Sequence, residues 1–345
     1  MMHLSQYFRD GLGLKANMIV FTFTFVGYAL GVASLFSTNS WLNAFGVLLT
    51  AQTLVISAYL LHEFSHHSIF KSPALNQKWG TLMMWINGSC YATFEEIRNK
   101  HMRHHVDRAD VISFDLRAFF ARLPAPLKAI ITFCEWAYIP AAEIIMHGMV
   151  IALPFTTPSH AHKRKRVLFT FLIRAAVFGA MAYVSIKALV LYMLAYGIML
   201  TMLRFADAYQ HTYDAFVVQD SGKKGEALPL GGKLRDAAYE QANTYSNLTS
   251  IQYPWLNILF LNFAYHNAHH EKPIAPWYQL PALHEKLYGK PSNNQPVVPM
   301  LQLLKSYHKH RLTRLSSDDY GVLEYKPGGA KGFIGAVGVS FLTAV

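Results

Sequence analysis

The sequence predicts an all-α integral membrane protein, with about four transmembrane helices in two hairpins and a cytosolic helical cap. Three observations lead to this fold class. The 345-residue chain is 52% hydrophobic and only 15% charged, against about 25% charged residues in an ordinary soluble domain. Four apolar segments approach the length that crosses a bilayer. Histidines gather at short intervals just outside these segments.

The first hairpin is predicted over residues 17–61. Residues 17–36 and 41–61 carry no charged side chain, and about 20 helical residues cross a hydrocarbon core of roughly 30 Å. Residues 17–36 are longer than the core of a signal peptide, which has about 7 to 15 residues, and no A-x-A site follows. We therefore expect this segment to remain in the protein.

The second hairpin is predicted over residues 167–204. Residues 167–186 contain one charge, Arg174, and residues 188–203 are short for a span. The flanking Lys187 and Arg204 extend both helices, because long basic side chains can reach from a helix end to the membrane surface.

Residues 127–155 are apolar but contain Glu135, Pro140 and Glu143. We expect an interfacial or re-entrant helix there rather than a fifth span. No element is predicted after Ser316, and the apolar residues 332–345 are too short to cross a bilayer.

The remaining residues, 62–166 and 205–345, are predicted to lie on one side of the membrane as parts of a single domain over residues 1–345. The basic run 163–166 marks this side as cytoplasmic by the positive-inside rule. The net charge of +11 fits anionic lipid headgroups better than nucleic acid, because the basic residues flank apolar segments.

The most specific feature of the sequence is a short histidine pattern that occurs three times. Positions i, i+3 and i+4 share one face of a helix, so each copy directs two or three imidazoles to one point. Imidazole binds iron, copper, zinc and nickel, and nine such ligands exceed what one ion accepts. The cap is therefore predicted to hold a di-metal site. The three boxes are His62, His66 and His67; His101, His104 and His105; and His266, His269 and His270.

Other classes of protein are weaker alternatives. Residues 62–66 match HExxH, in which two histidines bind zinc and the glutamate, here Glu63, is the general base of a membrane zinc protease. A zinc protease of this kind would have no role for the second and third boxes. A metal transporter would place its ligands near the membrane midplane, and a haem anchor would place histidines within the spans, whereas these boxes lie beyond the helix ends.

The boxes HEFSHH, HMRHH and HNAHH, placed after paired apolar helices, resemble those of the membrane fatty acid desaturase and hydroxylase superfamily. The similarity extends from about Trp41 to His270. It implies four transmembrane helices, a cytosolic helical cap and two iron ions held by the boxes. The family uses two spacings in its first box, and both are present here, so His66 and His67 compete for one role.

The resemblance also covers Asp207 and His211 at the end of the fourth apolar segment, where the family places a polar residue and a histidine near the metals. It implies that both are further ligands. Some members have an asparagine at the first position, so a carboxylate there is a departure. The alternative for Asp207 is a salt bridge with Arg204 or Arg103.

The resemblance implies O2-dependent oxidation of a lipid acyl chain, with fatty acyl desaturation as the leading reaction. Hydroxylation or ketolation of a lipid or carotenoid is the alternative within the superfamily. The chain has no fused haem segment, no cysteine set beyond Cys90 and Cys134, and no dinucleotide motif. Electrons are therefore expected from an external ferredoxin, rubredoxin or cytochrome b5, for which a basic surface is suitable, although the same charge also suits lipid headgroups.

Overall fold

The computed structural model is mostly helical, with little sheet. Its contacts divide the chain into two compact units, which we call the first unit (Met1–Glu95 and Val150–Met202) and the second unit (Glu96–Met149 and Leu203–Val345). The structure describes residues 2–11, 13–213, 216–219, 235–292, 294–317, 319–325 and 329–345.

The first unit is built from helices, and it contains the long apolar ones. Four helices among the described residues are long and apolar enough to cross a membrane, which confirms the predicted number of spans: Leu14–Leu35, Ser40–Ser65, Pro158–Val184 and Ile186–Asp207. The helices of this unit are α1 (Met2–Ser5), α2 (Leu14–Leu35), α3 (Ser40–Ser65), α4 (Pro73–Asn87), η1 (Pro158–Lys163), α9 (Arg164–Val184) and α10 (Ile186–Asp207), whose last turns belong to the second unit.

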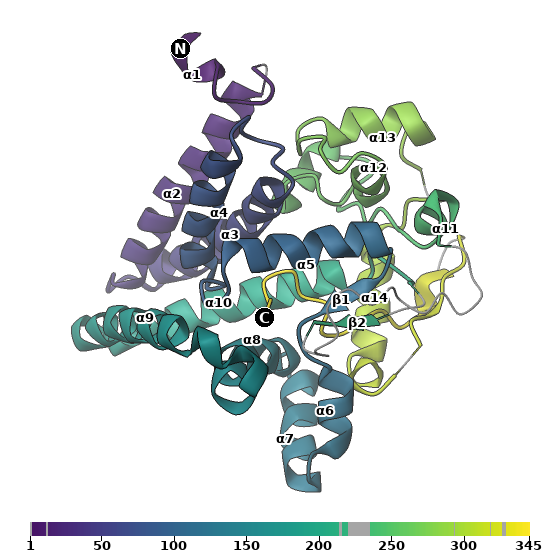
Figure 1. Cartoon of the computed structure of the whole chain (residues 1–345). Helices are drawn as coiled ribbons and strands as arrows, with labels where there is room; N and C mark the ends of the chain where they lie inside the picture. The colour runs from purple at the N-terminus through teal and green to yellow at the C-terminus, as the bar shows by residue number, and fades with distance from the viewer. Residues whose placement is uncertain are drawn as a thin grey trace. The chain divides into compact units, whose positions relative to one another are not determined.

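Helices α2 and α3 form the first predicted hairpin and lie side by side (Figure 1). Asn39 caps α3, because its side-chain oxygen accepts hydrogen bonds from the N–H groups of Trp41 and Leu42. A Cβ on Gly31 would lie 2.6 Å from Thr50 Oγ1. Glycine therefore permits the close approach of the two backbones, as small residues do between membrane helices.

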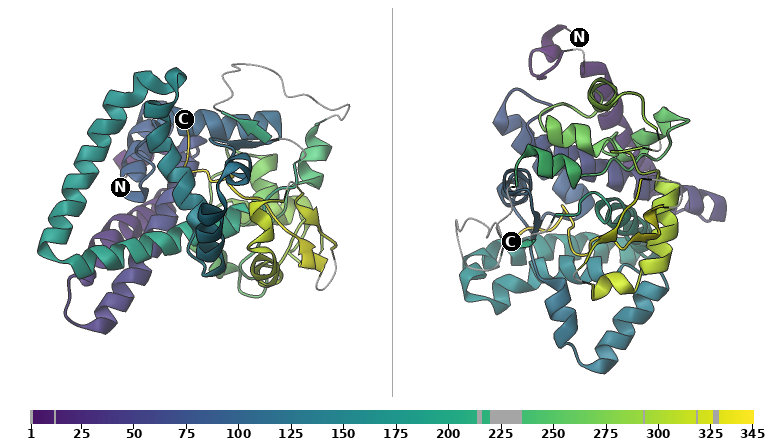
Figure 2. Two further views of the ribbon diagram at one scale, coloured as in Figure 1. Left: turned by 90° about the horizontal axis from the view of Figure 1, so that it is seen from below. Right: turned by 90° about the vertical axis from the view of Figure 1, so that its right-hand side faces the viewer.

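Helices α9 and α10 form the second hairpin, meeting at Ser185 and splaying apart (Figure 2). Lys187 Nζ donates a hydrogen bond to the Ser37 carbonyl and another, of 3.0 Å, to Asn43 Oδ1. Both hairpin turns therefore lie at the same end of the first unit, as the predicted topology requires.

The segment that leads into the second unit is fixed by basic and glycine residues of the first unit. Gly88 ends α4 with a φ of 87°, and a Cβ there would lie 2.6 Å from Tyr196 Oη. Arg166 on α9 then donates hydrogen bonds to the carbonyls of Cys90 and Ala92 at 3.2 and 3.1 Å. These contacts fix the backbone of residues 88–92 within the first unit.

The second unit holds shorter helices and two small sheets. Strands β1 and β2 pair in parallel, with Asp110 opposite Phe216, and β3 and β4 pair antiparallel, with Gly321 opposite Phe333. Its elements are α5 (Phe94–Asp107, entered from the first unit), β1 (Asp110–Ile112), α6 (Leu116–Arg122), α7 (Ala125–Trp136), α8 (Ala141–Thr156, which continues into the first unit), β2 (Phe216–Val218), α11 (Ala237–Ala242), η2 (Pro254–Phe260), α12 (His266–Glu271), α13 (Leu280–Tyr288), α14 (Met300–His310), η3 (Thr313–Leu315), β3 (Gly321–Val322), η4 (Gly329–Lys331) and β4 (Gly332–Phe333).

The apolar stretch 127–155 forms two helices, α7 and α8, rather than one span. Tyr138 has a left-handed φ of 61° between them, and Pro140 precedes α8. Among the described residues neither helix reaches the length of a membrane span. This confirms the prediction that no fifth span forms here.

The described residues after Ser316, for which the sequence predicts no element, contribute side chains to the core of the second unit. The ring of Phe333 is fully buried, 5.0 Å from that of Tyr209. Arg314 lies 4.2 Å over the Tyr307 ring and donates a hydrogen bond of 3.1 Å to Tyr209 Oη. Because this segment packs against the residues around His211, it helps to fix one part of the candidate site.

Candidate metal centre

The second box lies on α5, and its three histidines share one face of the helix. His101 is buried, and His104 and His105 are half-buried. The preceding Lys100 is buried as well, and its Nζ donates hydrogen bonds of 2.6 Å to the carbonyls of Ser340 and Thr343. Burial lowers the pKa of Lys100 to about 7. The C-terminal residues thus hold α5 directly beside the box.

The third box forms the short helix α12, and its three histidines are all buried. Leu261 and Asn262 have positive φ angles of 49° and 57° and turn the chain just before this helix. Asn267 fixes the helix, because its Nδ2 donates to the Thr244 carbonyl at 2.7 Å and its Oδ1 accepts from Ser246 Oγ at 3.0 Å. An asparagine inside the box therefore orients the histidines around it.

His211 follows the end of α10 and joins the histidines of the second and third boxes. Its Nε2 lies 3.0 Å from His104 Nε2 and 2.8 Å from His266 Nε2. His266 Nε2 in turn lies 3.2 Å from His270 Nε2. These residues form a group whose ligand atoms lie within 4.8 Å of one another, and we call it the four-histidine cluster: His104, His211, His266 and His270.

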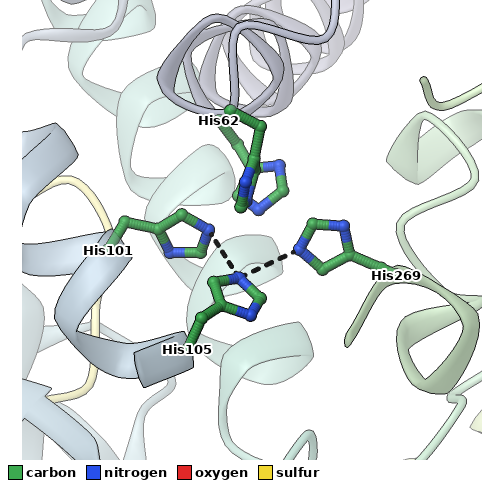
Figure 3. A group of neighbouring side chains, drawn as sticks. His62, His101, His105 and His269 are labelled. Atoms are coloured by element: carbon green, nitrogen blue, oxygen red, sulfur yellow. Dashed lines mark hydrogen bonds between the residues drawn. The ribbon is translucent and has the colours of Figure 1, made fainter. Parts of the chain in front are cut away.

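The other histidines of the two boxes form a second group in the same unit. His105 Nε2 lies 3.2 Å from His101 Nε2 and 3.3 Å from His269 Nε2, so the three rings point to one place (Figure 3). We call these residues the three-histidine cluster. The ring centroids of His105 and His270 are 4.3 Å apart, so the two clusters are neighbours.

Three tautomers in the four-histidine cluster are fixed by groups that accept a hydrogen bond at Nδ1. His104 Nδ1 lies 2.8 Å from the Ala109 carbonyl, and His270 Nδ1 lies 2.8 Å from Glu240 Oε1. His211 Nδ1 lies 3.2 Å from Thr244 Oγ1, whose own proton goes to the Glu240 carbonyl at 2.7 Å. Each Nδ1 therefore carries a proton, and each Nε2 presents a lone pair.

Three of these Nε2 lone pairs point to one place, an arrangement that a bound cation would stabilise. The observed separations of 2.8–3.3 Å agree with neighbouring donors around one ion, which lie about 3.0 to 3.4 Å apart when each bond is about 2.1 Å. Burial, and then the charge of neighbouring histidines, holds the pKa values of His211 and His266 well below the ordinary range. These imidazoles are therefore neutral and fit a metal ion.

Glu240 is the carboxylate at this site, and its two oxygens have different partners. Its Oε2 accepts a hydrogen bond of 2.9 Å from Arg108 Nε, and its Oε1 faces His270. Burial alone would raise the pKa of Glu240, but the bonds to His270 and Arg108 hold it below the ordinary value. Glu240 is not predictable from the sequence, because it lies 30 positions before His270 and no motif connects the two residues.

The first box ends α3 in the first unit. His62 and His66 are buried, with ring centroids 4.7 Å apart. His67 departs from the helix with a φ of 54°, and its carbonyl accepts a hydrogen bond from Arg9. The Glu63 carboxylate accepts a hydrogen bond of 2.7 Å from Ser68 Oγ.

Asp207 lies outside both clusters as the described residues define them. Its carboxylate accepts a hydrogen bond from the backbone N–H of Phe341. The alternative salt bridges are not formed in the described part of the chain, because Arg204 pairs with Glu135 and Arg103 pairs with Asp107. The implied role of Asp207 as a ligand stays a prediction.

The comparisons with known proteins agree with this description. The family model described as "Fatty acid desaturase" matches residues 39–298, which is more than half of the chain and includes all three boxes and His211. No curated protein matches the sequence. The family indicates a desaturase-like oxidoreductase that acts on lipid in a membrane setting with bound metal, and the histidine clusters supply ligands for such metal. This protein belongs to the fatty acid desaturase family.

Proposed function

We propose that this protein is a membrane di-iron enzyme that introduces a double bond into a lipid acyl chain, using O2 and two electrons. The observation that carries the proposal is the convergence of imidazole Nε2 atoms in two adjacent clusters of the second unit. Imidazole nitrogens gathered in this number are the donors that metal ions such as iron and zinc bind in proteins.

We propose one iron ion for each cluster. The four-histidine cluster supplies four Nε2 donors. We propose His62 and His66 of the first box as further donors for the second ion, because the family model covers all three boxes. His66 is preferred to His67, since His66 keeps the helical conformation beside His62 and His67 does not. Donor sets made of imidazole with no sulfur suit iron.

The bound metals would supply the oxidising power that breaks an unactivated C–H bond. The reaction balances as loss of two neighbouring hydrogens from the acyl chain, with O2, two electrons and two protons giving two waters. The protein holds the donors: the Ala109 carbonyl, Thr244 and Glu240 keep protons on the Nδ1 atoms. Phe263 and Phe341 lie against His269 and His101, at 5.3 and 5.1 Å between ring centroids, and cover the three-histidine cluster with apolar surface.

The membrane arrangement is part of the proposal. The two hairpin turns lie at one end of the first unit, and we propose that the boxes face the cytoplasm, since the basic run 163–166 belongs to the opposite connection. A separate acidic redox protein, such as a ferredoxin, rubredoxin or cytochrome b5, would deliver the electrons to that side.

The first experiment is elemental analysis of the full chain purified in mild detergent without added metal, followed by product analysis with labelled lipids, O2 and a reductase system. About two irons per chain and an alkene product support the proposal. An alcohol as the sole product would replace desaturation by hydroxylation. One zinc and no iron, also after anaerobic reconstitution with iron, would contradict the di-iron assignment and favour the HExxH protease.

A further inference from the structure

Three histidines of the four-histidine cluster donate a hydrogen bond from Nδ1, and we call the groups that accept these bonds the outer partners. The outer partners differ in charge. His104 donates to a backbone carbonyl and His211 to a hydroxyl, which are neutral acceptors. His270 donates to the Glu240 carboxylate at 2.8 Å, with the His270 side chain fully buried and the Glu240 side chain 9% exposed. A carboxylate behind a ligating imidazole raises its basicity and fixes its orientation.

Glu240 is held from several directions, so its position is determined by the fold. Asp236 caps α11, and its carbonyl accepts the Glu240 N–H at 3.0 Å. Arg108 donates to Glu240 Oε2 at 2.9 Å and, through Nη1, to the Arg235 carbonyl at 2.7 Å. Arg108 has a φ of 48°, a backbone conformation that side-chain-bearing residues rarely adopt.

Glu240 also connects the two clusters. Its carboxylate lies within 4.8 Å of ring nitrogens of both His270 and His105, which belong to different clusters. The Glu240 backbone carbonyl receives the Thr244 hydroxyl proton, and Thr244 in turn accepts from His211. One residue thus orients His270 by its side chain and His211 by its main chain.

We propose that Glu240, held by Arg108, is a positioning residue that strengthens metal binding at the four-histidine cluster and makes its ion different from that of the three-histidine cluster. The inference rests on the proposed function, because it requires metal in both clusters. It predicts two ions of unequal affinity and unequal spectroscopic signature, the tighter one at the four-histidine cluster.

The test compares Glu240→Gln with wild type in the full chain loaded with 57Fe. Glutamine keeps an oxygen that accepts from His270 and removes the negative charge. We expect one of the two irons to be lost at a chelator concentration about 10- to 100-fold lower, with a changed Mössbauer signal for that iron alone. The matched control is Glu271→Gln, which removes an exposed carboxylate next to His270 in the sequence and is expected to behave as wild type.

Chelator resistance and Mössbauer parameters that equal those of wild type in Glu240→Gln would overturn the inference. Equal loss of both irons would also overturn it, because the effect would not be specific to one cluster. If Glu240→Gln does not fold, Arg108→Met decides, since it leaves the His270 bond intact. Arg108→Met should weaken the binding of one iron severalfold, measured by chelator competition. Iron binding equal to that of wild type would overturn the inference. Wild type without two irons would instead contradict the proposed function.

Discussion

The two clusters share the histidines of the second and third boxes, but only the four-histidine cluster has a further member, His211. The four-histidine cluster lies wholly in the second unit, and three of its histidines have fixed tautomers. The three-histidine cluster, within the same unit, brings three Nε2 atoms together, and the rings of Phe341 and Phe263 lie 5.1 and 5.3 Å from those of His101 and His269. An ion in the first can be held by one unit alone, whereas we propose further donors from the first box for an ion in the second. The two metal ions are therefore expected to respond differently to mutation.

The largest effect is expected from His266→Ala in the four-histidine cluster. His266 Nε2 lies next to both His211 and His270, so its removal takes away a central donor. Mutation of an outer partner alone lowers metal affinity or activity about 10- to 100-fold. We therefore expect the loss of a ligand to lower turnover by more than about 100-fold. Bound iron, measured by elemental analysis, should fall by about one ion per chain. The control is the exposed His162→Ala. Full iron content in His266→Ala would contradict the assignment of one iron to the four-histidine cluster.

Mutations in the first box test the proposed ligands of the iron in the three-histidine cluster. His66→Ala should lose the iron of the three-histidine cluster and keep the other, because the four-histidine cluster needs no residue from the first unit. His67→Ala should keep both, since His67 lies outside the helix. Iron content and Mössbauer spectra of both variants measure this. The opposite pattern, with iron lost only in His67→Ala, would reverse the ligand assignment in the first box.

The periodic features of this protein were predictable from its sequence. The four apolar segments predicted the four candidate spans, because a membrane-spanning helix is recognised by its length and its apolar composition. The i, i+3, i+4 spacing predicted that His101 and His105 would share a helix face. The spacing did not predict that the second and third boxes would each divide between two clusters, with His104 in one and His105 in the other.

Features that depend on tertiary contacts were not predictable from local pattern. Glu240, Thr244 and the Ala109 carbonyl orient ligands across separations that no motif records. The C-terminal residues have no regular periodicity, yet Phe333 and Thr343 are fully buried. Their position follows from aromatic packing and from the hydrogen bonds of Lys100, which one sequence cannot reveal.

A smaller effect is expected when a neutral outer partner is changed. Thr244→Val removes the hydroxyl that accepts the His211 proton at 3.2 Å and keeps the side-chain volume. We expect about tenfold weaker iron binding at the four-histidine cluster, the lower end of the range for such partners, and no change at the other. Chelator competition measures it, with Thr244→Ser as the control that retains the hydroxyl. Equal affinities in the two variants would show that this hydrogen bond does not matter.

The smallest effect is expected from Glu63→Gln, beside the first box. The Glu63 carboxylate accepts from Ser68 Oγ, and a glutamine oxygen can accept the same bond. Loss of charge in one such hydrogen bond costs about 1 kcal/mol, so lipid oxidation should stay within about fivefold of wild type. A zinc protease would instead lose all activity, because its glutamate is the general base. If Glu63→Gln abolished activity while His266→Ala retained it, the first box would be the whole catalytic site and the two clusters would have no catalytic role.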